Sequence, residues 1–389
     1  MNKSKLIEAA TKKTPFYIFD YDCLKERVSI LKDKLPKNAT LCYAIKANPF
    51  LIPALKDENI LFEVCSPGEL SICENYRLNP SKIVFSGVCK TLEDVKRAYQ
   101  LKVKTITLES TLHCQYLIET VKEAPANTIH KQEVILRLTS GNQFGMSKDN
   151  VKDCIKQLKE IDSIVIRGIH FFTGTQKKIT KIADEVNFIV DFCNQLKQEL
   201  SIDFTDIEYG PGLSFNYFSK EDEAQNYSEY DQFVSFIQNA NYNFVIELGR
   251  YIASSCGYYV TSIMDVKTNE SGNYCIIDGG INHINYYGQM MGMKIPPVEQ
   301  IGKSKIYNEK KCTICGSLCT TADVVLRELI LNDPTPGDLL IFGNIGAYSV
   351  TEGVYLFLSH PMPEIYIYEN EQLICVRNTI ETYSINSKQ

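Results

Sequence analysis

The feature that most constrains the fold is a regular alternation, over the first two-thirds of the chain, of short β-rich apolar runs with amphipathic stretches. This alternation predicts a parallel sheet in which helices connect successive strands. Eight such runs occur within about 230 residues, the usual size of a closed (β/α)8 barrel with its working residues at the carboxyl ends of the strands. The runs lie at residues 41–45, 61–65, 82–85, 105–108, 134–138, 165–171, 206–209 and 244–248.

The pattern changes after about residue 256. Before this point, stretches such as 109–123 and 183–200 carry apolar residues at helical spacing. After it, strand-like segments separated by turns predominate, and they indicate an all-β region. We therefore predict a barrel at residues 23–256 and a second, all-β domain built from residues 1–22 together with 257–389.

The composition excludes several classes of protein. A formal net charge of −6 argues against a nucleic-acid or anionic-membrane binder, because both need a basic surface. No apolar run reaches the ~20 residues of a membrane span, and the charged N-terminus lacks the apolar segment of a signal peptide. Fourteen cysteines are too sparse over 389 residues for a disulfide scaffold, so we expect reduced thiols and a cytoplasmic protein.

A lysine follows the first predicted strand, in the segment Tyr43-Ala44-Ile45-Lys46-Ala47-Asn48. A desolvated lysine has a lowered pKa and can form a Schiff base. Taken alone, Lys46 is more simply read as a surface residue.

The ends of the sixth, seventh and eighth predicted strands suit a phosphate group. They read Phe172-Thr173-Gly174-Thr175, Gly210-Pro211-Gly212 and Glu247-Leu248-Gly249-Arg250. Glycines let backbone N–H groups approach an anion, and an arginine adds a bidentate donor. One such turn is weak evidence, but barrel phosphate sites cluster in this region.

A Schiff-base lysine, a phosphate site and an acidic residue are what pyridoxal 5′-phosphate requires. Glu247 would pair with the pyridine nitrogen, so that the ring acts as an electron sink. The alternative is that Glu247 is only a structural partner of Arg250.

These residues resemble the fold-type III pyridoxal-phosphate decarboxylases, which include ornithine and diaminopimelate decarboxylases. The resemblance covers nearly the whole chain and implies the alanine racemase-like fold. Several motifs carry it in the family's order: the Lys46 segment, Phe62-Glu63-Val64-Cys65-Ser66, Leu136-Arg137-Leu138, Glu247-Leu248-Gly249-Arg250, Cys315-Gly316-Ser317-Leu318-Cys319 and Gly346-Ala347-Tyr348.

The resemblance implies roles for these residues. Lys46 would carry the cofactor, and Tyr348 would touch its phosphate. The β domain would supply Cys319 to the active site of a partner subunit, which implies a homodimer with shared sites. Cys319 would protonate the substrate carbon after carbon dioxide leaves; the alternative is an inert buried thiol. The full set of cofactor-binding candidates is Lys46, Glu63, Arg137, His170, Phe172, Thr175, Gly210, Gly212, Glu247, Gly249, Arg250 and Tyr348.

One departure from the family concerns the pyridine ring. Many members stack a histidine on it, within a His-x-Gly-Ser pattern. Here Phe172 and Thr175 replace that histidine and serine. An aromatic ring can still stack, and His170 lies on the same side of the strand as Phe172. His170 is therefore either a site residue or a core histidine.

A second departure concerns the substrate. Relatives that bind a distal amine place an acid after the cysteine, whereas this chain has Thr320. Together with segments 278–283 and 357–361, this resembles a branch acting on conjugated amino acids, such as citryl-diaminopropionate in siderophore assembly or carrier-bound glutamate in butirosin assembly. His283, Asn285 and Tyr286 would contact a larger polar group, or else simply pack.

Several alternatives stay open. Cys312-x2-Cys315-x3-Cys319 is reminiscent of a zinc or iron–sulfur site, but no fourth ligand follows, so we expect no metal. The enzyme alternatives are a diaminopimelate or basic amino-acid decarboxylase and an amino-acid racemase of the same fold. A racemase needs two opposed acid–base groups, and Cys319 in its motif favours decarboxylation. The last alternative is a catalytically silent paralogue.

Overall fold

A computed structural model describes residues 3–219, 226–302 and 307–387. The chain forms two compact units. One comprises Val28–Ser214 with Tyr227–Tyr251, and the other comprises Met1–Arg27, Phe215–Asn226 and Ile252–Gln389. The boundaries expected from the sequence, at 22/23 and 256/257, lie near these divisions, but segment Phe215–Asn226 groups with the second unit rather than with the barrel.

The first unit is a closed barrel of eight parallel strands that follow one another in chain order. The last strand pairs with the first through Thr40 and Val245, which closes the barrel. Each predicted apolar run coincides with a strand, so the barrel prediction is confirmed. The strands are β2 (Ala39–Ala44), β3 (Leu61–Val64), β4 (Ile83–Phe85), β5 (Thr105–Leu108), β6 (Gln132–Arg137), β7 (Ile164–Phe172), β8 (Asp206–Gly210) and β9 (Asn243–Leu248).

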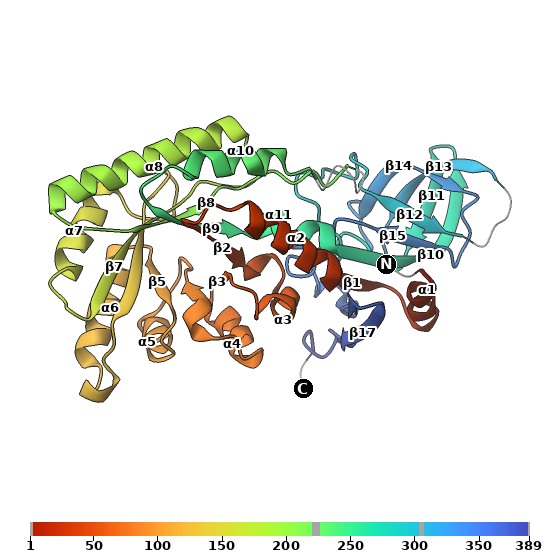
Figure 1. Cartoon of the computed structure of the whole chain (residues 1–389). Coiled ribbons are helices and arrows are strands. Elements are labelled where there is room, and N and C mark those ends of the chain that lie inside the picture. Colours follow the sequence, from red (N-terminus) through yellow and green to blue (C-terminus); the bar gives the residue numbers. More distant parts are fainter. Residues whose placement is uncertain (1–2, 220–225, 303–306, 388–389) are drawn as a thin grey trace. The chain divides into compact units, whose positions relative to one another are not determined.

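Helices alternate with these strands (Figure 1). The side chains of Ser66, Thr91 and Ser110 cap α4, α5 and α6 by accepting a hydrogen bond from the backbone N–H three residues later. Such a cap contributes about 1 kcal/mol. The helices are α2 (Tyr21–Lys34), α3 (Ile52–Leu55), α4 (Pro67–Asn75), α5 (Leu92–Gln100), α6 (Thr111–Glu123), α7 (Lys148–Leu158), α8 (Ile179–Leu200), α10 (Ser228–Ile237) and α11 (Arg250–Ala253).

A few buried charged residues interrupt the otherwise apolar barrel strands. Barrel strands are buried on both faces, and they are therefore normally almost wholly apolar. Burying a charge costs several kcal/mol unless the charge is paired. Five Glu, Arg or His side chains are nevertheless buried on these strands: Glu63, Arg137, His170, Glu208 and Glu247. They define the candidate site.

The second unit is built on a mixed sheet with the order β14-β13-β11-β10-β1-β16-β17, and β15 pairs with β10 and β12. The N-terminal strand joins it, pairing antiparallel with β10 and parallel with β16. The strands are β1 (Phe16–Asp20), β10 (Gly257–Asn269), β11 (Gly272–Ile277), β12 (Val298–Ile301), β13 (Glu309–Cys315), β14 (Val324–Asn332), β15 (Leu339–Phe342), β16 (Glu364–Glu369) and β17 (Gln372–Arg377).

A helix not predicted from the sequence, α1 (Lys3–Lys12), belongs to the second unit. Its Leu6 and Ala9 are buried in a cluster with Phe16, Val260 and Ile341. All fourteen cysteines lie within the described residues and are free thiols. Within those residues, no helix has both the length and the apolar character needed to cross a bilayer.

Candidate active site

Lys46 and Glu63 form an ion pair where β2 and β3 end. Lys46 lies in a 3-10 turn (Ile45–Ala47) directly after β2, and its Nζ is 2.8 Å from Oε2 and 3.1 Å from Oε1 of Glu63. The Cys65 thiol lies 3.5 Å from the same nitrogen. The sequence prediction named Lys46 and Glu63 but gave Cys65 no role.

Two opposed effects set the charge of Lys46. Burial lowers the pKa of the amine, and the neighbouring Glu63 carboxylate raises it. Burial is the largest single effect, but Glu63, Cys65 and Glu247 together outweigh it. The pKa of Lys46 therefore lies well above its usual value. Without the cofactor, the Lys46 amine is therefore protonated at neutral pH, whereas desolvation alone would favour the neutral amine.

Arg137 is a buried cation at the end of β6. It forms an ion pair with Glu109, which directly follows β5 and also accepts a hydrogen bond of 3.0 Å from the Gly145 backbone N–H. Its guanidinium lies 5.0 Å from the centre of the Phe144 ring. Nε of Arg137 has no hydrogen-bond partner within the described residues. A buried donor of this kind normally finds a partner, so this side of the guanidinium is available to a ligand.

His170, Glu208 and Glu247 form a cluster on three successive strands, β7, β8 and β9. A ring nitrogen of His170 and one carboxylate oxygen each of Glu208 and Glu247 lie within 4.8 Å of one another. His170 Nε2 is 3.3 Å from Glu247 Oε2. In the described part of the chain, three buried atoms of the cluster have no hydrogen-bond partner: His170 Nδ1, Glu208 Oε1 and Glu247 Oε1.

The two carboxyl groups of this cluster differ in charge. Burial raises the pKa of Glu208, and the neighbouring Glu247 raises it further. Burial also acts to raise the pKa of Glu247, but His170 and the hydrogen bond from Glu208 outweigh burial, so the pKa of Glu247 is strongly lowered. The cluster thus combines a neutral carboxyl group with an anionic one.

Glycines make room at the ends of β7 and β8. A Cβ on Gly210 would lie 2.5 Å from the Phe172 ring, and one on Gly212 would lie 2.1 Å from the Gly174 carbonyl oxygen. Gly212 also has a φ of +60°, which L side chains rarely adopt. The structure therefore requires glycine at both positions, and it brings the two turns together beside the half-buried Phe172.

A buried ion pair underlies these turns. Lys177 Nζ is 2.6 Å from Glu185 Oε2 of α8, and it donates to the Thr173 hydroxyl at 3.1 Å and to the Gly210 carbonyl at 3.3 Å. Tyr209 donates to the same Glu185 oxygen at 2.8 Å. These contacts tie the turn after β7 to the end of β8 and so fix the glycines.

The remaining barrel candidates lie at the same strand ends. Thr175 is half-buried in the turn after β7. A Cβ on Gly249 would lie 3.1 Å from that of Ala47, which follows Lys46. Arg250 is the first residue of α11 and is half-buried.

Six candidates lie in the second unit, and one of them, Asn285, is exposed. Cys319 and Thr320 are exposed, so Cys319 is not a buried core thiol in this chain. Tyr348 is half-buried with a φ of +68°. His283 and Tyr286 are buried: His283 Nδ1 is 2.8 Å from the Tyr259 hydroxyl, and Tyr286 donates to the Gly343 carbonyl at 2.7 Å. Contacts of these two residues with a substrate remain a prediction.

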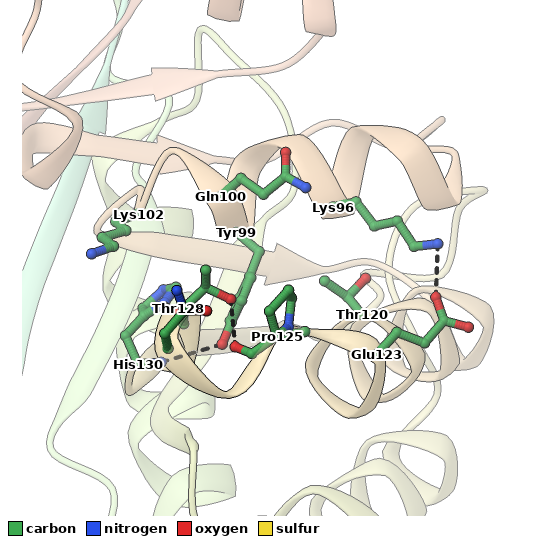
Figure 2. Close-up of a pocket in the computed structure, with 11 residues that line it drawn as sticks. Lys96, Tyr99, Gln100, Lys102, Thr120, Glu123, Pro125, Thr128 and His130 are labelled. Atoms are coloured by element: carbon green, nitrogen blue, oxygen red, sulfur yellow. Dashed lines mark hydrogen bonds and ion pairs between the residues drawn. The ribbon is translucent and has the colours of Figure 1, made fainter.

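Two other features do not contribute to this site. Within the described residues, Cys312, Cys315 and Cys319 do not form a group in which all three sulfur atoms lie within 4.8 Å of one another. A pocket of about 450 Å³ lies between α5, α6 and the turn Ala126–Thr128 (Figure 2). It is lined by Tyr99 and His130, whose rings stack at 4.1 Å, and contains none of the predicted site residues.

Sequence reasoning missed Glu109, Cys65 and Glu208. Glu109 directly follows a predicted strand, so its position at a strand end was a usable signal. Glu208 and Gly210 lie two residues apart on β8 and so face the same side of the sheet. Glu208 could therefore have been found from the sequence, because it is a carboxylate within an apolar strand and faces the same side as the glycine of the predicted turn.

Known proteins resemble this chain over most of its length. L-glutamyl-[BtrI acyl-carrier protein] decarboxylase of Niallia circulans is 28% identical, over 92% of this chain and 90% of that protein. 2-[(L-alanin-3-ylcarbamoyl)methyl]-2-hydroxybutanedioate decarboxylase of Staphylococcus aureus is 27% identical, over 92% and 94%. Diaminopimelate decarboxylase of Campylobacter jejuni is 26% identical, over 86% of each chain.

The fold agrees with that of solved decarboxylases. Diaminopimelate decarboxylase of Helicobacter pylori, complexed with L-lysine, superposes with a TM-score of 0.84 at 22% identity, over 99% of this chain and 98% of that one. A sequence profile of the family described as "Pyridoxal-dependent decarboxylase, pyridoxal binding domain" matches residues 22–254. The chain therefore belongs to the pyridoxal-dependent decarboxylase family.

Proposed function

We propose that this protein is a pyridoxal-phosphate-dependent α-decarboxylase for an amino acid whose distal end is acylated, carboxylated or carrier-linked. We further propose that it works in the cytoplasm as a homodimer with shared active sites. The observation that carries the proposal is the set of ionisable residues at the carboxyl ends of the barrel strands, in which the half-buried Lys46 accompanies the buried Arg137 and Glu247.

The residues of the barrel fit the cofactor. Nε of Arg137, Nδ1 of His170 and Oε1 of Glu247 are buried and have no partner within the described chain, and such atoms normally pair. The anionic Glu247 suits a protonated pyridine nitrogen. The turns at Gly210 and Gly212 let backbone N–H groups approach a phosphate group, as helix and loop termini commonly do.

Pyridoxal phosphate, when bound, supplies an electron sink for the charge left on the α-carbon as carbon dioxide departs. Lys46 supplies the amine that holds the cofactor covalently. Because Lys46 is protonated without the cofactor, it must first lose a proton, and Glu63, at 2.8 Å, can accept that proton. Glu63 thus both orients the amine and exchanges its proton.

Glu247 keeps its charge through its neighbours. His170 and Glu208 stabilise the anion and lower the pKa of Glu247 despite its burial. A carboxylate held in this form can keep a bound cation protonated. Phe172, half-buried at the end of β7, offers an aromatic face in place of the histidine of many relatives.

Cys319 is our candidate for the group that returns a proton to the substrate carbon. Its exposure supports a role toward a second subunit, because a thiol at the surface can reach a partner's site. Tyr348 is the corresponding candidate for the phosphate. Both assignments rest on the resemblance of their motifs to those of the family.

The substrate class follows from Thr320 and from the relatives. Burying an ammonium group without a partner costs several kcal/mol, and a threonine hydroxyl cannot neutralise one. The two relatives at 28% and 27% identity are named for substrates with conjugated amino acids. Diaminopimelate is the second candidate substrate, since a diaminopimelate decarboxylase is 26% identical.

A substrate panel tests this proposal. Purified protein with pyridoxal phosphate is assayed for carbon dioxide release from free ornithine, lysine and diaminopimelate, and from glutamate linked to a carrier or citryl-diaminopropionate. We expect turnover of a conjugated substrate and poor turnover of the free diamines, with Lys46→Ala as the inactive control. Turnover of a free diamine at kcat/KM above roughly 10⁴ M⁻¹s⁻¹, the lower end for typical enzymes, would contradict the substrate class. Inversion of optical rotation without carbon dioxide would indicate a racemase, and no reaction on any substrate would favour a silent paralogue.

Mixed subunits test the shared site. Cys319→Ala and Lys46→Ala homodimers should each be nearly inactive, and mixing them should restore about one wild-type site per heterodimer. Cys375→Ala, another exposed cysteine of the second unit, is the matched control and should keep full activity. If subunits exchange and activity does not return, Cys319 does not act across the interface.

A further inference from the structure

Glu208 is a buried carboxyl group to which the proposed reaction assigns no contact with cofactor or substrate. It lies on β8 with 1% of its surface exposed. The strand register pairs it with His170 on β7. A carboxylate oxygen of Glu208 lies within 4.8 Å of both a carboxylate oxygen of Glu247 and a ring nitrogen of His170.

Two carboxyl groups this close and this deeply buried cannot both be ionised without a large electrostatic cost. His170 Nε2 hydrogen-bonds Glu247, and this contact stabilises the Glu247 anion. The other charged groups that act on this pair are Glu63, which disfavours a second anion, Arg137 and Lys46. The proton shared by the two carboxyl groups therefore resides on Glu208.

We propose that Glu208 is a neutral carboxyl group that positions Glu247, donating its proton in a hydrogen bond so that Glu247 is the single anion of the cluster. The close approach of their carboxylate oxygens, within 4.8 Å, supports this arrangement, as do the opposite directions of their pKa shifts. Glu208 is thus a positioning residue. The consequence for cofactor affinity rests on the proposed pairing of Glu247 with the pyridine nitrogen.

The proposal predicts that charge at position 208 is dispensable, whereas the donor is needed. Glu208→Gln keeps the size of the side chain and an N–H donor but has no charge. Glu208→Leu introduces an apolar side chain of similar bulk and removes the donor. A hydrogen bond to a charged group is worth roughly 10- to 100-fold in an equilibrium constant. Glu208→Leu should therefore weaken pyridoxal-phosphate binding by about that factor, and Glu208→Gln by no more than about threefold.

Two measurements test it. Infrared spectra of the cofactor-free protein at neutral pH should contain the carbonyl band of a protonated carboxyl group, and this band should disappear in Glu208→Gln. Absorbance titration of the cofactor-free protein with pyridoxal phosphate gives the dissociation constants of the wild type and the two variants. Circular dichroism checks that each variant folds, and the infrared comparison needs only the conservative Glu208→Gln variant.

Three results would overturn the proposal. One is an unchanged infrared spectrum in Glu208→Gln, since the proton would then lie elsewhere. The others are equal losses of affinity in the Gln and Leu variants, or no loss in a folded Leu variant. Glu247→Gln separates this from the proposed function: if that variant binds pyridoxal phosphate as tightly as the wild type, the pairing of Glu247 with the ring fails, while the infrared result still reports on Glu208.

Discussion

Replacing His283 with glutamine should lower stability at neutral pH and reduce sensitivity to acid. The imidazole is only 3% exposed, and its nitrogens contact the Tyr259 hydroxyl at 2.8 Å and the Asn282 side chain at 3.1 Å. Burial, helped by the charges of His360 and Arg377, lowers the pKa of His283 from 6.5 to about 3. Between about pH 6.5 and pH 3, His283 is therefore neutral in the folded protein but protonated in the unfolded chain.

The sign and size of the effect follow from this shift. The contribution of neutral His283 to stability is fully present above pH 6.5. As the pH falls from 6.5 towards 3, the free energy of unfolding decreases by about 1.36 kcal/mol per pH unit. By about pH 4 the loss is roughly 3 kcal/mol. His283→Gln lacks this titration but loses the bond to Tyr259, which costs about 1–3 kcal/mol. The stability curves of the wild type and the variant should therefore cross between about pH 5.8 and pH 4.3.

Urea unfolding followed by circular dichroism, at fixed protein concentration over this pH range, measures both curves. Tyr259→Phe is the matched control, because it removes the same hydrogen bond but keeps the imidazole and hence the acid sensitivity. Parallel curves for the wild type and His283→Gln would refute the reasoning. Unchanged stability combined with a raised KM would instead favour the predicted contact of His283 with the substrate.

Three further predictions concern the site. Lys46→Ala should abolish the visible absorption of the bound cofactor and lower turnover by many orders of magnitude, because covalent catalysis is lost; full activity would end the assignment. Gly212→Ala should destabilise the protein, because its Cβ would lie 2.1 Å from the Gly174 oxygen at a φ of +60°. Differential scanning calorimetry should show a lower Tm than for Gly68→Ala, whose Cβ meets only Ser66 Oγ, at 3.7 Å. Thr320→Asp should weaken activity on an acylated substrate by placing a charge beside the acyl group, measured as kcat/KM.

The barrel and the strand-end residues could be predicted because both depend on local pattern. Alternating apolar runs define the strands, and parallel strands bring their carboxyl ends to one rim, so Lys46 and Glu247 were candidates by position. The family resemblance strengthened both and added Arg137. The partners of these residues could not be found in this way. Glu109 pairs with Arg137, and Glu208 with Glu247, across strand contacts that no local periodicity encodes.

The second unit shows the same limit. The segment around His283 has the sequence of a turn near a β strand, which is compatible with either a substrate contact or packing. Its burial depends on β1 and β10: Tyr17 donates to the His283 carbonyl at 2.6 Å, and Tyr259 contacts the ring. These contacts join residues up to 266 positions apart, and helix α1 likewise owes its place to packing on this sheet.

The charged residues at the barrel rim are of two kinds: cations that are already paired with a carboxylate, and one carboxylate with an unpaired oxygen among the described residues. Lys46 is paired with Glu63, and Arg137 with Glu109, so the positive charge of both cations is already balanced by a carboxylate. Glu247 has the reverse character, because its neighbours leave it anionic with one oxygen unpartnered within the described chain. We therefore propose that the backbone N–H groups of the glycine turns, rather than these two cations, bind the phosphate group, and that Glu247 pairs with the protonated ring nitrogen. Glycine is required at positions 210 and 212 by the neighbouring Phe172 ring and Gly174 carbonyl oxygen, and it also leaves the turns without side chains that would obstruct an anion.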